Sequence, residues 1–257
     1  MKRTLTFTCL MALLAIGSPA LLAQDKPAGA AKEALPSAES IFDKSIEATG
    51  GKDASKKMKN AVLKGSMEMM GMLVELTAYI AEPNLVFSET SIPEMGKVQQ
   101  GFDGKNAWSY NPMMGPSLLQ GKEADAIKNS FSNVLVTDWK TKFSKAETIG
   151  VETAEGEECY KVAVTAKDGT QGVNFFSKKS GLLIRTDATA ATEMGEMAVQ
   201  IIFKDYRKVG DLVIPFQVIT STGGMSMPMT YSEIKINVDL PESTFEPPPE
   251  VKALLNK

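Results

Sequence analysis

The chain has 257 residues, with 28 basic and 31 acidic side chains and a formal net charge of −3. This acidic balance argues against nucleic acid as a partner. The sequence contains no histidine, so the most common general base and metal ligand of proteins is missing. It also has no nucleophile elbow, phosphate-binding glycine loop or dinucleotide-binding fingerprint. We therefore expect a protein that is not an enzyme and that needs no cofactor or metal.

Residues 1–23 have the pattern of a secretory signal peptide. Two basic residues precede the apolar run 10–16, and small residues lead up to Ala23, near which we expect cleavage. No later stretch approaches the roughly 20 apolar residues of a membrane-spanning helix. Residues 24–36 are rich in Ala, Lys and Pro and predict a flexible leader, followed by a single β domain over 37–257. We expect a periplasmic location.

Only one cysteine, Cys159, remains after removal of the signal peptide. The mature chain therefore cannot form an internal disulfide, and its hydrophobic core has to hold it together. The neighbours Tyr160, Val162 and Val164 predict a strand, so we favour a partly buried structural thiol over a redox residue.

Two helices are predicted from apolar residues at helical spacing. The first covers 40–49, with Gly50 and Gly51 placed to end it, and the second covers 122–133. Residues 52–59 contain four lysines and are expected to bridge to the first strand.

The remaining segments predict about eleven antiparallel strands in a meander. Dipeptides that contain glycine separate β-prone runs, and four of them predict tight hairpin turns: Asp103-Gly104, Asp168-Gly169, Gly210-Asp211 and Gly223-Gly224. In the last strand the apolar residues change parity, which predicts a bulge near Ser232. The expected strands are 61–69, 72–81, 85–92, 98–102, 105–110, 143–153, 159–167, 170–177, 182–190, 197–209, 212–222 and 225–238.

The predicted fold is mainly β, a curved antiparallel sheet that forms an unclosed half-barrel under a helical lid. An open sheet of this size curls, and helices that cover its concave face without filling it leave an apolar cavity suited to acyl chains. Large apolar side chains are the candidates for lining this cavity, although burial in the core is the default for each one. The candidates are Met67, Met69, Phe87, Trp108, Tyr110, Met113, Met114, Phe175, Phe203, Phe216, Met225, Met227 and Met229.

The methionines allow a second interpretation. Met225, Met227 and Met229 alternate along one strand face, about 7 Å apart, and thioethers are soft ligands for Cu(I). Because copper sites usually recruit histidine as well, we favour core or pocket lining, for which methionine is well adapted.

Glycine, proline and aromatic residues at scattered positions over most of the mature chain form a pattern. It comprises Gly50-Gly51, Pro83-Asn84, Gly101-Phe-Asp-Gly104, Trp108, Asn111-Pro112, Gly115, Leu118-Leu119, Gly121, Cys159-Tyr160-Lys161, Ser180-Gly-Leu-Leu-Ile-Arg185, Asp205-Tyr206-Arg207, Ile214-Pro215 and Phe245-Glu-Pro247. Together with the signal peptide, this pattern resembles the outer-membrane lipoprotein-sorting (LolA/LppX-like) family of bacteria. The resemblance implies an unclosed β-barrel with a helical lid that holds a hydrophobic ligand, such as the acyl moiety of a lipoprotein.

Two hypotheses for the function follow. The first is a periplasmic carrier or sensor that encloses an acyl chain, a lipid or the lipidated end of a protein. The alternative is an interaction module whose interior is filled by its own side chains and whose exposed edge or loops bind a protein of the cell envelope. A cavity between sheet and helices, or its absence, distinguishes them.

Overall fold

A computed structural model of the protein describes residues 34–69, 71–129, 139–192 and 195–255. The predicted signal peptide, nearly all of the predicted leader and the end of the helix expected over 122–133 lie outside these residues. From Leu35 onward the chain forms one compact unit. None of the helices in the described segments is long and apolar enough to cross a membrane.

The strands form a single antiparallel sheet, and 13 of them are described. Their bounds are β1 (Asn60–Met69), β2 (Met72–Ala81), β3 (Leu85–Ile92), β4 (Gly96–Phe102), β5 (Ala107–Asn111), β6 (Gly115–Leu119), β7 (Phe143–Ala154), β8 (Glu157–Ala166), β9 (Gln171–Ser177), β10 (Leu183–Thr192), β11 (Gly195–Val209), β12 (Leu212–Thr222) and β13 (Met225–Ile236).

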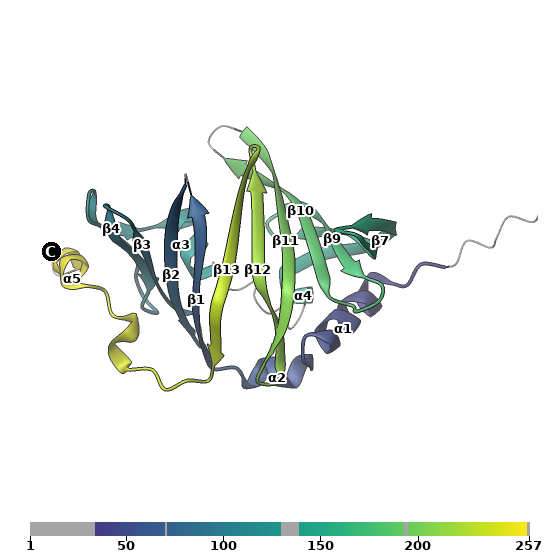
Figure 1. The fold of residues 1–257 in the computed structure, drawn as a ribbon, viewed down its shortest axis with the longest axis horizontal. Coiled ribbons are helices and arrows are strands. Elements are labelled where there is room, and N and C mark those ends of the chain that lie inside the picture. The colour runs from purple at the N-terminus through teal and green to yellow at the C-terminus, as the bar shows by residue number, and fades with distance from the viewer. Residues whose placement is uncertain (1–33, 70, 130–138, 193–194, 256–257) are drawn as a thin grey trace, which may run out of the picture. The chain divides into compact units, whose positions relative to one another are not determined.

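The strand order is β6-β5-β4-β3-β2-β1-β13-β12-β11-β10-β9-β8-β7. Two meanders therefore meet where β1 pairs with β13, in the middle of the sheet (Figure 1). Within the described residues β6 and β7 are its two edges and do not pair with each other. The sheet is an unclosed half-barrel, which confirms the predicted fold class.

The helices lie before, between and after the strands. They are α1 (Ala38–Ala48), α2 (Gly51–Lys57), α3 (Gly121–Asn129), α4 (Trp139–Lys142), the 3-10 turn η1 (Glu242–Phe245) and α5 (Pro249–Leu255). Ser37 caps α1, since its hydroxyl oxygen accepts a hydrogen bond from the Ser40 amide at 3.2 Å. The left-handed Gly50 follows, with φ of 114°.

Four local predictions are corrected. The four-lysine segment 52–59 is not a simple bridge, because most of it forms α2. The strand β6 was missed, since the Gly115 and Pro116 with which it begins are typical of loops. The one-turn helix α4 was too short to give a periodic signal. The hairpin at Asp103-Gly104 has a longer loop, since Phe102 pairs with Ala107, and the Asp103 carboxylate accepts hydrogen bonds from the amides of Lys105 and Asn106 at 2.8 and 2.6 Å.

Other local predictions are confirmed. Val209 pairs with Leu212, and Thr222 pairs with Met225, so Gly210-Asp211 and Gly223-Gly224 form two-residue turns. In the pairing of β1 with β13, Lys64 lies opposite Glu233 and the next residue lies opposite Tyr231. Ser232 is therefore the extra residue of a bulge, and its hydroxyl donates to the Lys64 carbonyl oxygen at 3.3 Å.

One face of the sheet carries α1 and α3, and we call it the inner face. Pairing through consecutive strands places Leu63, Ala78 and Val86 on this side. Helix α3 packs Ala124 and Ile127 directly against Val86 and its neighbours, whereas α1 packs against residues of β8 and β9 in the other meander. The helices predicted to cover the concave side do lie on one common face.

The opposite, outer face has its own apolar clusters. Trp108 is completely buried there, 6.1 Å from the Phe87 ring, and η1 and α5 pack against β3, β5 and β6 (Figure 1). In the other meander the guanidinium of Arg185 lies 3.9 Å from the centroid of the Phe175 ring. Cys159 is completely buried in the same cluster as Phe175, and burial raises the pKa of its thiol, which fits the predicted structural role.

The two edges of the sheet differ. Helix α5 packs against β6 and its neighbour β5. The other edge, β7, contains two register shifts in which Ser144 and Ile149 are the extra residues. Lys145 and Glu147 lie between these bulges and form an ion pair at 3.3 Å. Bulges and charges of this kind are typical of strands that are protected against edge-to-edge pairing.

Candidate functional site

A cavity of about 480 Å³ lies between α1, α4 and the inner face of the sheet from β8 to β1. Ligand sites for small molecules have volumes of about 300 to 1,000 Å³, so this one has room for a ligand of moderate size. Most of its wall is apolar, and the wall on the sheet side includes Leu63, Val164, Ile201, Val218 and Ile234.

Helix α1 forms one wall and is attached to the sheet at its end. Phe42 and Ile46 face the cavity from the apolar stripe of the helix. The Thr49 carbonyl oxygen accepts a hydrogen bond from the Val213 amide of β12 at 3.0 Å. A Cβ atom on Gly50 would lie only 2.3 Å from the Asp211 carbonyl oxygen, so only glycine allows the chain to pass this close to the β11–β12 turn.

An aromatic cluster closes the cavity on the side of α4. The Phe42 ring stacks on Trp139 with centroids 5.1 Å apart, and it meets Phe176 edge-on at 5.2 Å and Phe143 at 5.8 Å. Contacts of this geometry stabilise beyond simple area burial. They hold α1, α4 and β9 together at this end of the cavity.

The strand β11 supplies two aromatic side chains to the wall because its alternation is interrupted. Phe203 and Tyr206 both line the cavity although they differ in parity. Between them Asp205 has φ of 54°, the left-handed region that is uncommon for residues other than glycine. The Tyr206 hydroxyl donates to the Leu183 carbonyl oxygen at 2.7 Å, and burial raises the pKa of this phenol well above its ordinary value.

Polar groups in the wall are few and partly paired. The Thr186 hydroxyl donates to Oδ1 of Asn174, which is buried, at 2.9 Å. Among the described residues that line the cavity, Lys142 is the one with a charged side chain. Burial lowers the pKa of its ammonium group to about 8.

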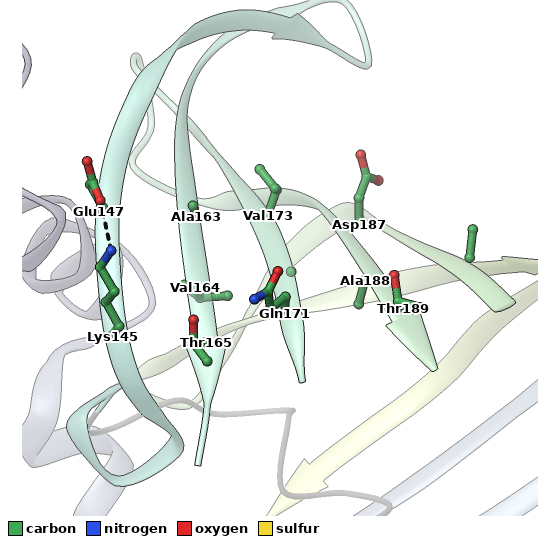
Figure 2. Close-up of a pocket in the computed structure, with 12 residues that line it drawn as sticks. Lys145, Glu147, Ala163, Val164, Thr165, Gln171, Val173, Asp187, Ala188 and Thr189 are labelled. Carbon is green, nitrogen blue, oxygen red and sulfur yellow. Dashed lines mark ion pairs between the residues drawn. The ribbon is translucent and has the colours of Figure 1, made fainter. Parts of the chain in front are cut away.

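A second hollow of about 530 Å³ lies on the outer face of β7 to β11 (Figure 2). Figure 2 shows the Lys145–Glu147 ion pair on one side and Val173 and Asp187 on neighbouring strands. This groove is open to solvent and more polar. We assign the candidate site to the cavity beneath α1 instead, because its wall is more apolar and it is less open, so it removes more of a hydrophobic ligand's surface from water.

The sequence-predicted site residues are distributed over several places, and Phe203 is the one that lines the cavity. Phe216 packs in the core cluster with Leu63 and Ile234. Phe87, Trp108, Tyr110 and Phe175 lie on the outer face, as their pairing with neighbouring strands shows. Met113 and Met114 are 74% and 88% exposed in the turn between β5 and β6. A role of these residues in ligand binding stays a prediction.

The remaining candidates are methionines of the inner face. Met67 of β1 lies directly opposite Met229 of β13, and Met69 lies two residues further along β1. Met225 and Met227 share the face of Met229, which itself is buried, whereas Met225 is 64% exposed. This arrangement places thioethers of two strands side by side, and the Cu(I) hypothesis stays a prediction.

Several lining residues were not singled out from the sequence. Phe175 and Phe176 are adjacent, and the pattern alone does not tell which one points inward; it is Phe176. Lys142 belongs to a stretch, Trp139–Lys142, that has no periodicity. Phe42 and Ile46 belong to the helix predicted over 40–49 and lie on its buried side.

Comparisons with known proteins show which solved structures have a similar fold. No protein-family model and no curated protein matches the sequence. Among solved structures, a DUF1329 family protein from Desulfovibrio piger is similar with a TM-score of 0.56 at 14% identity, covering 81% of this chain and 96% of that one. A LolA superfamily protein from Nitrosomonas europaea gives a TM-score of 0.55 at 13% identity, covering 83% and 99%.

A putative outer membrane lipoprotein-sorting protein domain from Vibrio parahaemolyticus is similar with a TM-score of 0.53 at 12% identity, covering 85% of this chain and 97% of that one. At these identities the comparisons concern the fold alone. They confirm the resemblance to the lipoprotein-sorting group at that level: the chain has a LolA-like fold over most of its described length.

Proposed function

We propose that this protein is a non-enzymatic carrier or sensor that binds a hydrophobic ligand in the cavity between α1, α4 and the inner face of the sheet. The observation that carries the proposal is the largely apolar cavity of about 480 Å³ between α1, α4 and the inner face of the sheet. Each methylene group of an acyl chain gains about 0.8 kcal/mol on burial. Several kcal/mol are therefore available from one chain, before the costs of ordering the ligand are subtracted.

The ligand class we propose is an acyl chain, a lipid or the lipid anchor of a protein, and the proposed location is the periplasm. The signal-peptide pattern of residues 1–23 supports the location. A LolA-like fold, shared with a domain named for the sorting of outer membrane lipoproteins, supports the ligand class by analogy of fold. The cavity argues against the alternative of an interaction module with a filled interior.

Two measurements test the proposal. Protein purified gently from its own host should release a lipid on organic extraction, detectable by mass spectrometry. The emptied protein should then bind the uncharged fluorescent probe N-phenyl-1-naphthylamine, and a long-chain alcohol should displace it. Protein that carries no lipid and does not bind the probe would leave the interaction module as the better account.

A further inference from the structure

Methionine side chains gather on the inner face of the sheet, at the end where β1 turns into β2 and where β13 begins (Figure 1). Met69 of β1 lies directly opposite Met72 of β2, and Met67 of β1 lies directly opposite Met229 of β13. Directly paired residues, and residues two apart on one strand, share a side of the sheet. Met227 is the next residue of β13 on this side. Five thioethers from three neighbouring strands therefore lie close together.

Neither the cavity nor the core accounts for this cluster as a whole. None of its members is among the described residues that line the cavity. Packing explains Met229, which is buried and whose sulfur lies 3.2 Å from the position that a Cβ atom on Gly65 would occupy. The other four side chains are only half-buried. They form a patch of thioethers that a small ligand can reach from solvent.

The register of the strands brings the sulfur atoms within reach of a single ion. The Cβ atoms of directly opposite residues are about 5 Å apart, and those of diagonal neighbours are about 7–8 Å apart. Met69 is the direct neighbour of Met72 and lies about 7 Å along β1 from Met67. Methionine has three rotatable bonds, and its sulfur lies two bonds beyond Cβ. Three sulfur atoms from these positions can therefore meet at one point.

The chemistry of the donors selects the kind of ion. Thioethers are soft ligands that suit Cu(I), whereas Zn²⁺ is held by thiolate, imidazole or carboxylate groups. On this side of the sheet, the residues of β1 from Leu63 to Met69 and of β2 from Met72 to Ala78 carry no charge, so these segments do not compensate for a divalent ion. Thioethers that converge from neighbouring strands supply a soft donor set without the histidine that the sequence lacks.

We propose that Met67, Met69 and Met72 bind one Cu(I) ion through their sulfur atoms, with Met227 of β13 placed to supply a fourth ligand. The site differs from the one considered from the sequence, because β1 and β2 provide the three principal ligands and not β13 alone. It lies outside the cavity, so it is a second binding site and does not depend on the proposed function.

Competition with the coloured Cu(I) chelator bicinchoninate, in the presence of ascorbate and without oxygen, measures the affinity. The parent protein should bind about one Cu(I) ion per chain, and an excess of Zn²⁺ should not compete. The triple variant Met67→Leu/Met69→Leu/Met72→Leu should lose at least about tenfold in affinity for Cu(I). Because leucine and methionine have similar volumes, this variant should stay folded, which urea unfolding checks.

A matched control removes the same number of thioethers from other places. Met58 precedes β1 at its opposite end, and Met113 and Met114 lie in the turn between β5 and β6. The variant Met58→Leu/Met113→Leu/Met114→Leu should bind Cu(I) like the parent protein. Cys159→Ala, which removes the buried thiol, should do so as well. X-ray absorption of the Cu(I) protein should show sulfur neighbours around the ion.

Three results would overturn the proposal. The first is the same Cu(I) affinity in the parent protein and in the variant of Met67, Met69 and Met72. The second is an equal loss in the two triple variants, since scattered surface thioethers would then be responsible. The third is a first shell of nitrogen or oxygen atoms around the ion. If the first triple variant does not fold, Met69→Leu alone should weaken Cu(I) binding about threefold or more, and an unchanged affinity would contradict the site.

Discussion

The two halves of the sheet are covered by helices in different ways. In the half from β2 to β6, α3 packs Ala124 and Ile127 directly onto Val86. In the half from β7 to β13, α1 presents Phe42, whose contacts are with the aromatic rings at one end. None of the described residues that line the cavity comes from α3 or from β2 to β6. The half from β2 to β6 is a packed core. The half from β7 to β13 contains most of the cavity, which we call the chamber from here on.

The comparison teaches that the same sheet can support stability in one half and binding in the other. Helix α3 packs Ala124 and Ile127 directly onto the sheet and leaves no room there for a ligand. Helix α1 contacts β8 and β9 at Phe42 and β12 at Thr49, and Ser45 and Ile46 between these contacts line the cavity. Substitutions in the packed half should therefore affect the free energy of unfolding, and substitutions in the chamber should affect the affinity for ligand.

The largest effect is expected for Trp108→Ala in the packed half. Trp108 is completely buried, and removal of a buried indole leaves a cavity that costs about 3–5 kcal/mol of unfolding free energy. Urea unfolding measures this loss, while ligand affinity, determined under conditions where the variant is folded, should stay unchanged. Met114→Ala, at an 88% exposed position, is the control and should stay within about 0.5 kcal/mol. A selective loss of ligand binding in Trp108→Ala would contradict the division into two halves.

The next effect concerns the attachment of α1 to the chamber. Gly50→Ala forces a Cβ to within 2.3 Å of the Asp211 carbonyl oxygen at φ of 114°, so we expect a loss of about 2–3 kcal/mol and weaker ligand binding as the helix shifts. Gly51→Ala is the matched control, because its φ is also positive, at 86°, but its Cβ would have no neighbour within 4 Å. It should cost only about 1 kcal/mol. Equal losses in the two variants would show that the contact with the turn is unimportant.

The third prediction concerns a substitution that fills part of the chamber. Val218 lines the cavity from β12, and Val218→Phe should reduce affinity for N-phenyl-1-naphthylamine at least tenfold by occupying its space, with a change in unfolding free energy of less than about 1.5 kcal/mol. Val173→Phe introduces the same group on the outer face, in the groove of Figure 2, and should bind the probe normally. Unchanged binding in Val218→Phe would place the ligand elsewhere.

The smallest predicted effect is a pH dependence of stability, which arises from Lys142 in the wall of the chamber. Burial lowers the pKa of Lys142 from 10.5 to about 8. Below pH 8 the lysine is protonated in both states, and the folded protein bears the full cost of burying the charge. Between about 8 and 10.5 the unfolded chain binds a proton that the folded protein has lost, so the contribution of Lys142 to stability rises with pH.

Comparison with Lys142→Met isolates this contribution. All other titratable groups are the same in the two proteins, so their effects largely cancel. Relative to Lys142→Met, the parent protein should gain roughly 1 kcal/mol in urea unfolding between neutral and alkaline pH, after allowance for the solvent that still reaches the lysine. A constant difference would mean that the ammonium group is well hydrated.

The sequence determines the strand pattern well because alternation and turn chemistry are local. The two-residue turns at Gly210-Asp211 and Gly223-Gly224 and the bulge at Ser232 follow from a few adjacent residues. The strand β6 and the short helices α2 and α4 were missed because glycine, proline and lysine there carry no periodic signal. The fold class was still correct, since it depends on the number and order of strands.

The lining of the chamber was harder to predict, because it depends on which side of each strand faces the helices. Trp108 and Phe87 are large and alternate correctly, yet they form a second, outer cluster near the C-terminal helix. Parity along a strand says which residues share a side but not which side is concave. The inward direction of Tyr206 depends on the left-handed Asp205, which no simple pattern indicates.

The described sheet has two edge strands that do not pair with each other, and the bulged β7 edge has a consequence for the behaviour of the protein at high concentration. Regular edge strands of two molecules would pair with each other, and repeated pairing would produce fibres. The extra residues at Ser144 and Ile149 break the spacing that such stacking requires. The β7 edge can therefore stay unpaired without leading to polymerisation through that strand.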